Sequence, residues 1–144
     1  MKTVITLTLL YLSLFAQTPF ILTKFKKVYP LVEIHTQKVP QSYKAKITKI
    51  IKEYAKEMKI NTDGFAQRPL GIVITRVPVC NITILKVQLI LAEEVKRLDD
   101  GEEVFALTYH KEDIFEVENL DEDLIESVEY LLGDFQDQYK EDNE

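Results

Sequence analysis

The side chains best suited to chemistry in this sequence are two histidines and one cysteine: His35, His110 and Cys80. A zinc site needs three or four ligands, and a nucleophilic centre needs a base beside its serine or cysteine. His35 alternates with apolar residues in a strand pattern, which predicts an ordinary surface histidine. His110 is followed by Glu112 and Asp113, which form a sparse ligand set for a metal ion. We therefore expect no catalytic residue, no metal and no cofactor.

Other activities are disfavoured by composition. The chain has only four glycines and no glycine-rich loop that could cradle a phosphate. Its net charge of −6 and the lack of interleaved aromatic and basic residues argue against binding to nucleic acid. A single cysteine excludes an intramolecular disulfide, and the Pro78-Val79 connection before Cys80 predicts a semi-buried thiol. These features favour a binding or assembly domain over an enzyme.

Charge is divided unevenly along the chain. Residues 1–76 hold 13 Lys and Arg against 4 Asp and Glu, whereas residues 77–144 hold 5 against 20. In one interpretation a basic helix lies beside an acidic helix, where exposed ion pairs contribute only about 0–1 kcal/mol each. In the other, the two signs form separate surfaces, and the lysines meet an acidic protein partner or an anionic membrane surface.

Two groups of residues are candidate binding sites. A helix predicted over residues 43–60 has an apolar stripe on one side and a lysine-rich face on the other. This candidate basic face consists of Lys44, Lys49, Lys52, Lys56 and Lys59. A crevice between helices and sheet could instead hold a small or lipid-like ligand, although core packing is an alternative role for its aromatic residues. The candidate lining is Tyr43, Tyr54, Phe105 and Tyr109.

The first residues have the composition of an export signal. Lys2 precedes an apolar run without charges, and the next charged residue is Lys24. Such a run is typical of a signal peptide, and we expect cleavage after Ala16 and a periplasmic or secreted protein. The alternative is an uncleaved inner-membrane anchor that begins at Val4 and ends at Leu22, just long enough to span a bilayer.

The remaining patterns predict one domain. Alternating apolar and polar residues indicate strands over residues 28–39, 70–77, 82–97 and 103–110, and wider spacing indicates helices over 43–60 and 120–139. Ser42 is a plausible cap for the first helix, and Asn119 with Glu122 could cap the second. The result is an α+β fold in the order β-α-β-β-β-α, with a four-stranded mixed sheet and two helices packed on one face. We expect the other face of the long hairpin to be polar. The chain then divides into a signal peptide (1–16), a linker (17–27), the domain (28–139) and a flexible tail (140–144).

The hairpin VQLILAEEVKRLDDGEEVFALTYH, leading into a terminal amphipathic helix, resembles small envelope domains of bacteria. These are the accessory proteins of lipopolysaccharide assembly and lipid transport, and the amino-terminal domain of the Tol-system translocation protein. The resemblance implies two helices against a mixed four-stranded sheet, and a role in docking to an envelope protein. It carries over no site residue. Many of those accessory proteins are lipoproteins, and this chain lacks the lipid-bearing cysteine.

Overall fold

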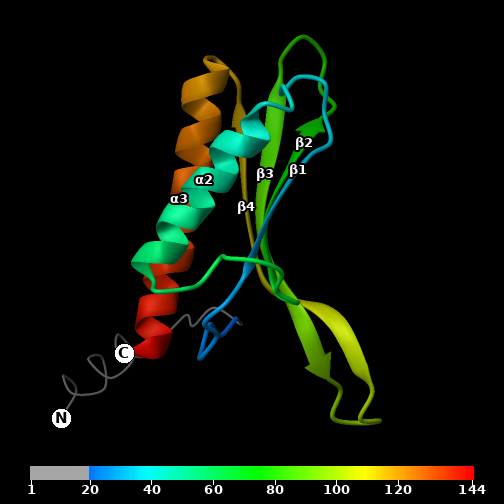
Figure 1. The fold of residues 1–144 in the computed structure, drawn as a ribbon. Helices are drawn as coiled ribbons and strands as arrows, with labels where there is room; N and C mark the ends of the chain where they lie inside the picture. The colour runs from blue at the N-terminus through cyan, green and yellow to red at the C-terminus, as the bar shows by residue number, and fades with distance from the viewer. Residues whose placement is uncertain (1–19) are drawn as a thin grey trace, which may run out of the picture.

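The structure is a computed structural model that describes residues 20–144, so the predicted signal peptide and its cleavage after Ala16 lie outside the described residues. Along the chain the elements are β1 (Tyr29–Ile34), α2 (Tyr43–Glu57), β2 (Pro69–Val77), β3 (Ile84–Lys96), β4 (Glu103–Glu116) and α3 (Leu120–Asn143). The strands form one mixed sheet, and both helices lie on the same side of it (Figure 1). The predicted α+β class and the order β-α-β-β-β-α are confirmed.

The sheet combines one parallel pair with an antiparallel meander. β1 runs parallel to β2, and α2 connects them. A long crossover is required there because the chain must return to the same end of the sheet. β2, β3 and β4 then follow as antiparallel neighbours. Pro30 is tolerated because β1 is an edge strand, as its sequence predicts.

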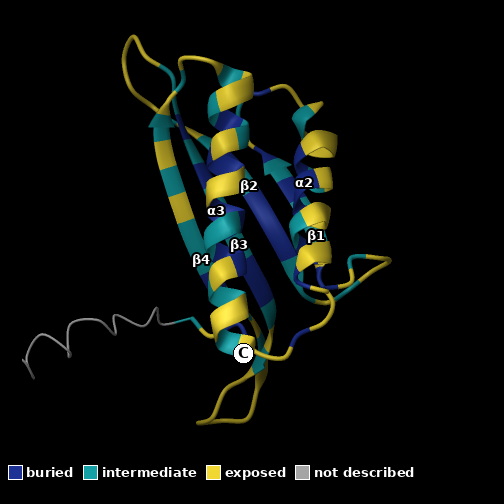
Figure 2. Cartoon of the chain, turned by 90° about the vertical axis from the view of Figure 1, so that its left-hand side faces the viewer, coloured by how far each residue is buried: buried dark blue, intermediate teal, exposed yellow. Residues whose placement is uncertain are grey.

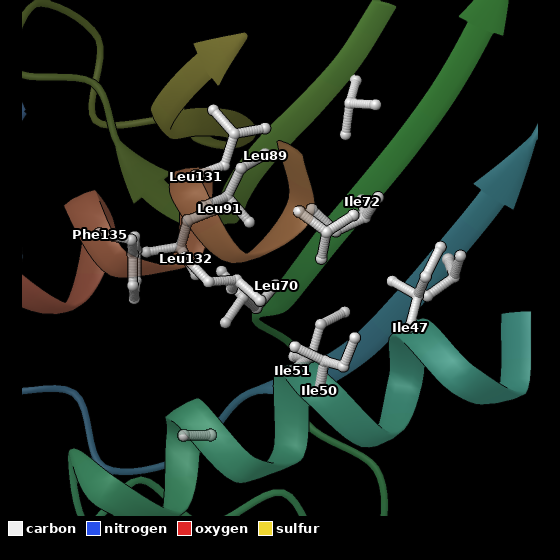
Figure 3. Close-up of a cluster of buried hydrophobic side chains, with 14 of the residues drawn as sticks. Ile47, Ile50, Ile51, Leu70, Ile72, Leu89, Leu91, Leu131, Leu132 and Phe135 are labelled. Atoms are coloured by element: carbon white, nitrogen blue, oxygen red, sulfur yellow. The ribbon is translucent and has the colours of Figure 1, made fainter. Parts of the chain in front are cut away.

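The hydrophobic core lies between the helices and one face of the sheet. Strands present every second side chain to a given face, and here those side chains meet the apolar stripes of α2 and α3. Figure 2 shows buried positions on the sides of both helices that face the sheet, and Figure 3 shows the side chains that meet there. Burying a large apolar side chain contributes about 1.5–3 kcal/mol relative to leaving it exposed. Fully buried members include Ile47, Ile51, Leu70, Ile72, Leu89, Leu131 and Phe135.

A β-bulge divides the long hairpin of β3 and β4. Leu91 lies opposite Tyr109, but Ala92 lies opposite Leu107, so Thr108 is an extra residue on β4. Beyond such a bulge the alternation of faces is shifted by one residue. Tyr109 is therefore buried under α3, whereas Leu107 and Phe105 are exposed on the opposite face of the sheet, although all three have odd numbers.

β4 continues beyond its predicted end at His110. Residues 111–116, which the acidic composition assigns to a connector, pair with the first half of β3. Lys111 forms an ion pair with Asp134 of α3, and Phe115 packs against the core. Cross-strand pairing and these contacts outweigh the low strand propensity of the charged residues.

The other predicted ends shift by a few residues. β1 stops at Ile34 rather than Val39, and α2 stops at Glu57, two residues before Lys59 adopts a positive φ of 59°. Ser42 occupies the N-cap position of α2 but makes no side-chain cap hydrogen bond. At α3 the Asp123 carboxylate accepts hydrogen bonds from the backbone N–H groups of Glu118 and Asn119, each at 2.8 Å.

The segments expected to be a linker and a flexible tail are both part of the folded domain. Leu22 and Phe25 are buried in the core. The Leu22 N–H donates to the Asp142 carboxylate at 2.6 Å, and the Asn143 amide donates to the Leu22 carbonyl at 2.6 Å. These bonds hold the last turn of α3, which is helical to Asn143, and correct the expectation that residues 140–144 are a flexible tail.

Candidate functional site

The lysine-rich face predicted on α2 is exposed, and among residues 20–144 none of its five lysines forms an ion pair with the acidic helix. Lys44, Lys49, Lys52 and Lys56 lie on α2 and are exposed, and Lys49 is paired only with Glu53 of the same helix, at 3.6 Å. Lys59, which was predicted to belong to the same helical face, is also exposed but lies beyond the end of α2. Within residues 20–144, the one ion pair between α2 and α3 joins Lys46 to Asp121 at 2.8 Å. Mutual neutralisation of the two helices is therefore limited, among the described residues, to this one ion pair. None of the five predicted lysines takes part in that pair.

The aromatic residues predicted to line a crevice are not brought together. The Tyr43 hydroxyl donates to the Asp121 carboxylate at 3.1 Å, and the Tyr54 hydroxyl donates to the Glu129 carbonyl at 3.4 Å, so both join α2 to α3. Burial, followed by the hydrogen bond to Asp121, raises the pKa of Tyr43. Tyr109 packs edge-on against Phe135, with ring centroids 5.0 Å apart, and burial raises its pKa.

Core side chains occupy the space between helices and sheet, where the crevice was expected (Figure 3). Phe105 does not face this space, because the bulge at Thr108 turns it to the uncovered face of the sheet. Its four-residue spacing from Tyr109 suggested a shared face, and the extra residue breaks that spacing.

The chemically capable side chains stay dispersed. His35 pairs with Glu33 on β1 at 2.9 Å, and His110 lies 3.0 Å from the Gln88 amide on β3. No group of three His, Cys, Asp or Glu among residues 20–144 is placed to hold a metal ion. Cys80 is exposed, which corrects the expectation of a semi-buried thiol.

The face of the sheet that the helices leave open carries large apolar side chains. Phe105 is 61% exposed and Leu107 is 55% exposed, although the pattern predicts a polar face here. Phe65, in the connection before β2, is 76% exposed. Large exposed apolar groups that lie together mark interaction surfaces more often than scattered ones do.

Three aromatic rings border a groove on this face. Tyr29 and Phe65 contact each other with ring centroids 6.1 Å apart, and Phe105 lies across the groove from the β4 side. The groove has a volume of about 270 Å³. Its lining is Tyr29, Phe65, Ala66, Gln67, Pro69, Glu94 and Phe105, and we call it the aromatic groove.

Glu94 is the one charged residue that lines the aromatic groove. It lies directly opposite Phe105 in the β3–β4 register. Its neighbour Glu93 alternates to the other face and pairs with Arg68 at 2.6 Å. The Glu94 carboxylate has no hydrogen bond or ion pair with any residue in the described part of the chain. The groove therefore combines aromatic walls with one unpaired carboxylate.

A second hollow lies between β4 and α3 and is acidic. Its lining includes the carboxylates of Asp113, Glu116, Asp123 and Glu126. Asp123 already caps α3. The buried Ser127 hydroxyl beside the hollow has no hydrogen-bond partner among the described residues. We assign no ligand to it.

The aromatic groove was missed at the level of sequence, although two signals were present. Residues 104–107 read Val-Phe-Ala-Leu, so this strand is apolar on both of its faces. If only one face of such a strand is buried, two of these four apolar side chains must be exposed on the other face. Phe65 stands in a turn beside Gly64, where a large aromatic residue is unusual. The spatial approach of Tyr29 and Phe65 to β4 depends on the sheet order and could not be read from spacing.

Comparison with known proteins adds little to this picture. No protein-family model and no curated protein matches the chain. Among solved structures, the chain is similar to a minor lipoprotein from Acinetobacter baumannii, at 10% sequence identity and a TM-score of 0.35, over 81% of this chain and 91% of the other. A similarity this low assigns neither a family nor a residue role.

The alternative membrane anchor lies outside the described residues except for residues 20–22. Across residues 20–144, the helices are too short or too polar to cross a membrane. Leu22, the last residue of the predicted anchor from Val4 to Leu22, is fully buried in the domain core. A span that used Leu22 would remove it from this core.

Proposed function

We propose that this chain is an exported, non-enzymatic domain of the bacterial envelope that docks to a protein partner through the uncovered face of its sheet. The observation that carries the proposal is the group of exposed apolar side chains around the aromatic groove. The apolar amino-terminal segment, typical of an export signal, supports the location. The dispersal of His35, His110 and Cys80 in the fold supports a binding role rather than catalysis.

The physical basis is the cost of leaving apolar surface in water. Covering such surface contributes about 25 cal/mol per Å² removed from water. Phe65, Phe105 and Leu107 are all more than half exposed, so a partner segment that covers them gains this contribution without unfolding any part of the domain. β1, which carries Tyr29, is a short strand at the edge of the sheet, and within residues 20–144 its outer edge pairs with no other strand, so the same segment could pair with it.

The basic face of α2 is a separate, electrostatic surface. Lys44, Lys52 and Lys56 have no ion pair with any residue of the described chain. We assign them to an acidic region of the same partner, because exposed charges mainly accelerate association and fix orientation. Reversing charge at Lys52 and Lys56 should slow association and weaken its dependence on salt. Tight binding of the unmodified protein to anionic vesicles, in the absence of a partner, would assign this face to the membrane surface instead.

We do not propose the alternative function, binding of a lipid-like ligand in a helix–sheet crevice. Ile51, Leu89, Leu131 and Phe135 occupy that space and are fully buried. A ligand there would have to displace the core.

Crosslinking in intact envelopes tests the proposal. The unmodified protein should give a reproducible adduct with one partner, and Phe105→Ser should abolish it while leaving the circular dichroism spectrum unchanged. Leu98→Ser is the matched control, because Leu98 is fully exposed at the tip of the same hairpin but does not line the groove. Recovery of monomer alone, or equal loss of the adduct in both variants, would reject docking through this face.

A further inference from the structure

We infer that the aromatic groove receives an arginine side chain from the docked partner segment. This inference rests on the proposed docking function and names the chemistry that the groove selects. It is carried by three features of one small site: aromatic walls, a limited volume and an unpaired carboxylate.

The size of the groove fits one side chain. Its volume of about 270 Å³ is below the range of about 300–1,000 Å³ that is usual for sites enclosing a whole small molecule. Tyr29 and Phe65 form one wall, and Phe105 approaches from the adjacent hairpin. A long, flat group can lie against these rings.

The charge of the groove selects a cation. Glu94 lies directly opposite Phe105 on the neighbouring strand, and both residues line the groove. Its carboxylate is therefore beside the aromatic rings. Of the neighbouring charges, Glu93 already pairs with Arg68, whereas Lys96 and Glu103 are cross-strand neighbours in the register. An aliphatic side chain in the groove would partly desolvate Glu94 without pairing it, which is unfavourable.

Arginine fits both features at once. A guanidinium group stacks on aromatic faces and can form two parallel hydrogen bonds to a carboxylate. Lysine offers a compact, strongly hydrated charge that satisfies the carboxylate but stacks poorly. A quaternary ammonium would use the rings but has no N–H to donate to Glu94.

A titration of the full chain with short blocked peptides, followed by NMR of the phenylalanine rings, tests the selectivity. Gly-Arg-Gly should bind with a Kd of about 1–10 mM, as expected for a single side-chain anchor. The same peptide with citrulline, which has nearly the same shape but no charge, should bind at least about fivefold more weakly. Glu94→Gln should lower the affinity for the arginine peptide to that for the citrulline peptide. The matched variant Glu103→Gln should leave the Kd of the arginine peptide unchanged.

Three results would overturn the inference. These are equal binding of arginine and citrulline peptides, no effect of Glu94→Gln, and tighter binding of a leucine peptide or of tetramethylammonium. Binding of none of these probes up to about 50 mM would also reject an arginine anchor.

Partner crosslinking with the same variants separates this inference from the docking proposal. Loss of the adduct in both Glu94→Gln and Phe105→Ser supports both. Loss in Phe105→Ser alone retains docking through this face and rejects the arginine anchor. Retention in both variants rejects docking, and with it the partner arginine.

Discussion

The two faces of the sheet are built from the same strands but differ in what covers them. Toward the helices, Leu70, Leu85 and Leu89 are fully buried. On the opposite face, Leu107 of β4 and Phe105, which lines the aromatic groove, are more than half exposed. The first set of side chains holds the domain together, and we propose that the second set holds a partner. Apolar content alone therefore does not identify the core, because alternation and the bulge at Thr108 decide which side chains the helices cover.

The largest contrast is expected between two phenylalanines. Phe135→Ala removes a fully buried ring and should lower the free energy of unfolding by about 3–5 kcal/mol, because a cavity remains in the core. Phe105→Ala removes a ring from the uncovered face and should change it by less than about 0.5 kcal/mol. Urea denaturation followed by circular dichroism measures both. Similar losses in the two variants would mean that the uncovered face is part of the stabilising core.

A smaller effect is expected for the ion pair that borders the covered side. Arg68 pairs with Glu93 and also lies over the Phe25 ring, 5.2 Å from its centroid. Arg68→Met should lower the free energy of unfolding by about 1–3 kcal/mol, because it leaves the partly buried Glu93 carboxylate unpaired. Arg97→Met is the matched control, since Arg97 pairs with Asp100 at the exposed hairpin tip, and it should cost about 0–1 kcal/mol. Equal costs would show that burial does not distinguish these pairs.

Alkaline pH should weaken the covered side through Tyr109. Burial raises the pKa of this hydroxyl above its ordinary value of 10.0, so the folded state favours the protonated form. The corresponding stability is fully present below pH 10.0 and is lost as the pH rises through the raised pKa. Tyr109→Phe should therefore reduce the loss of stability between pH 9 and 11, measured by urea denaturation at each pH. Equal losses of stability in the unmodified protein and in Tyr109→Phe over this pH range would show that ionisation of Tyr109 does not weaken the fold.

The smallest effect concerns the single ion pair between the helices. The hydrogen bond from Lys46, then that from Tyr43, lowers the pKa of Asp121 below its ordinary value of 3.8. A lowered pKa means that the contribution to stability is present above pH 3.8 and disappears as the pH falls through the lowered value. Lys46→Gln should move the titration midpoint of the Asp121 carboxyl, followed by NMR, back toward 3.8. An unchanged midpoint would show that this pair is not formed in solution.

Sequence patterns were sufficient for the order of elements and for the core stripes of α2 and α3. The apolar stripe predicted over residues 43–60 is buried in the structure at Ile47 and Ile51. The hairpin sequence turns at Gly101, which has a φ of 73°. The acidic end of β4 was missed, because its strand state depends on pairing with β3.

The candidate site was predicted less well than the fold, for a physical reason. The exposed lysine face could be read from helical spacing alone. The aromatic groove requires the extra residue at Thr108 and the approach of Phe65 to Tyr29 across the sheet, and neither leaves a mark at fixed spacing. Residues brought together by tertiary contacts are the part of a site that one sequence does not reveal.

The central claim, docking through the uncovered face, is tested most directly by site-specific photo-crosslinking in intact envelopes. A photoreactive phenylalanine analogue would replace Leu107 on the uncovered face and, in a separate protein, Glu141 on the exposed side of α3. We predict a single adduct of defined mass from position 107, its loss when Phe65→Ser is added, and no such adduct from position 141. Equal adducts from both positions, or none from position 107, would contradict docking through this face.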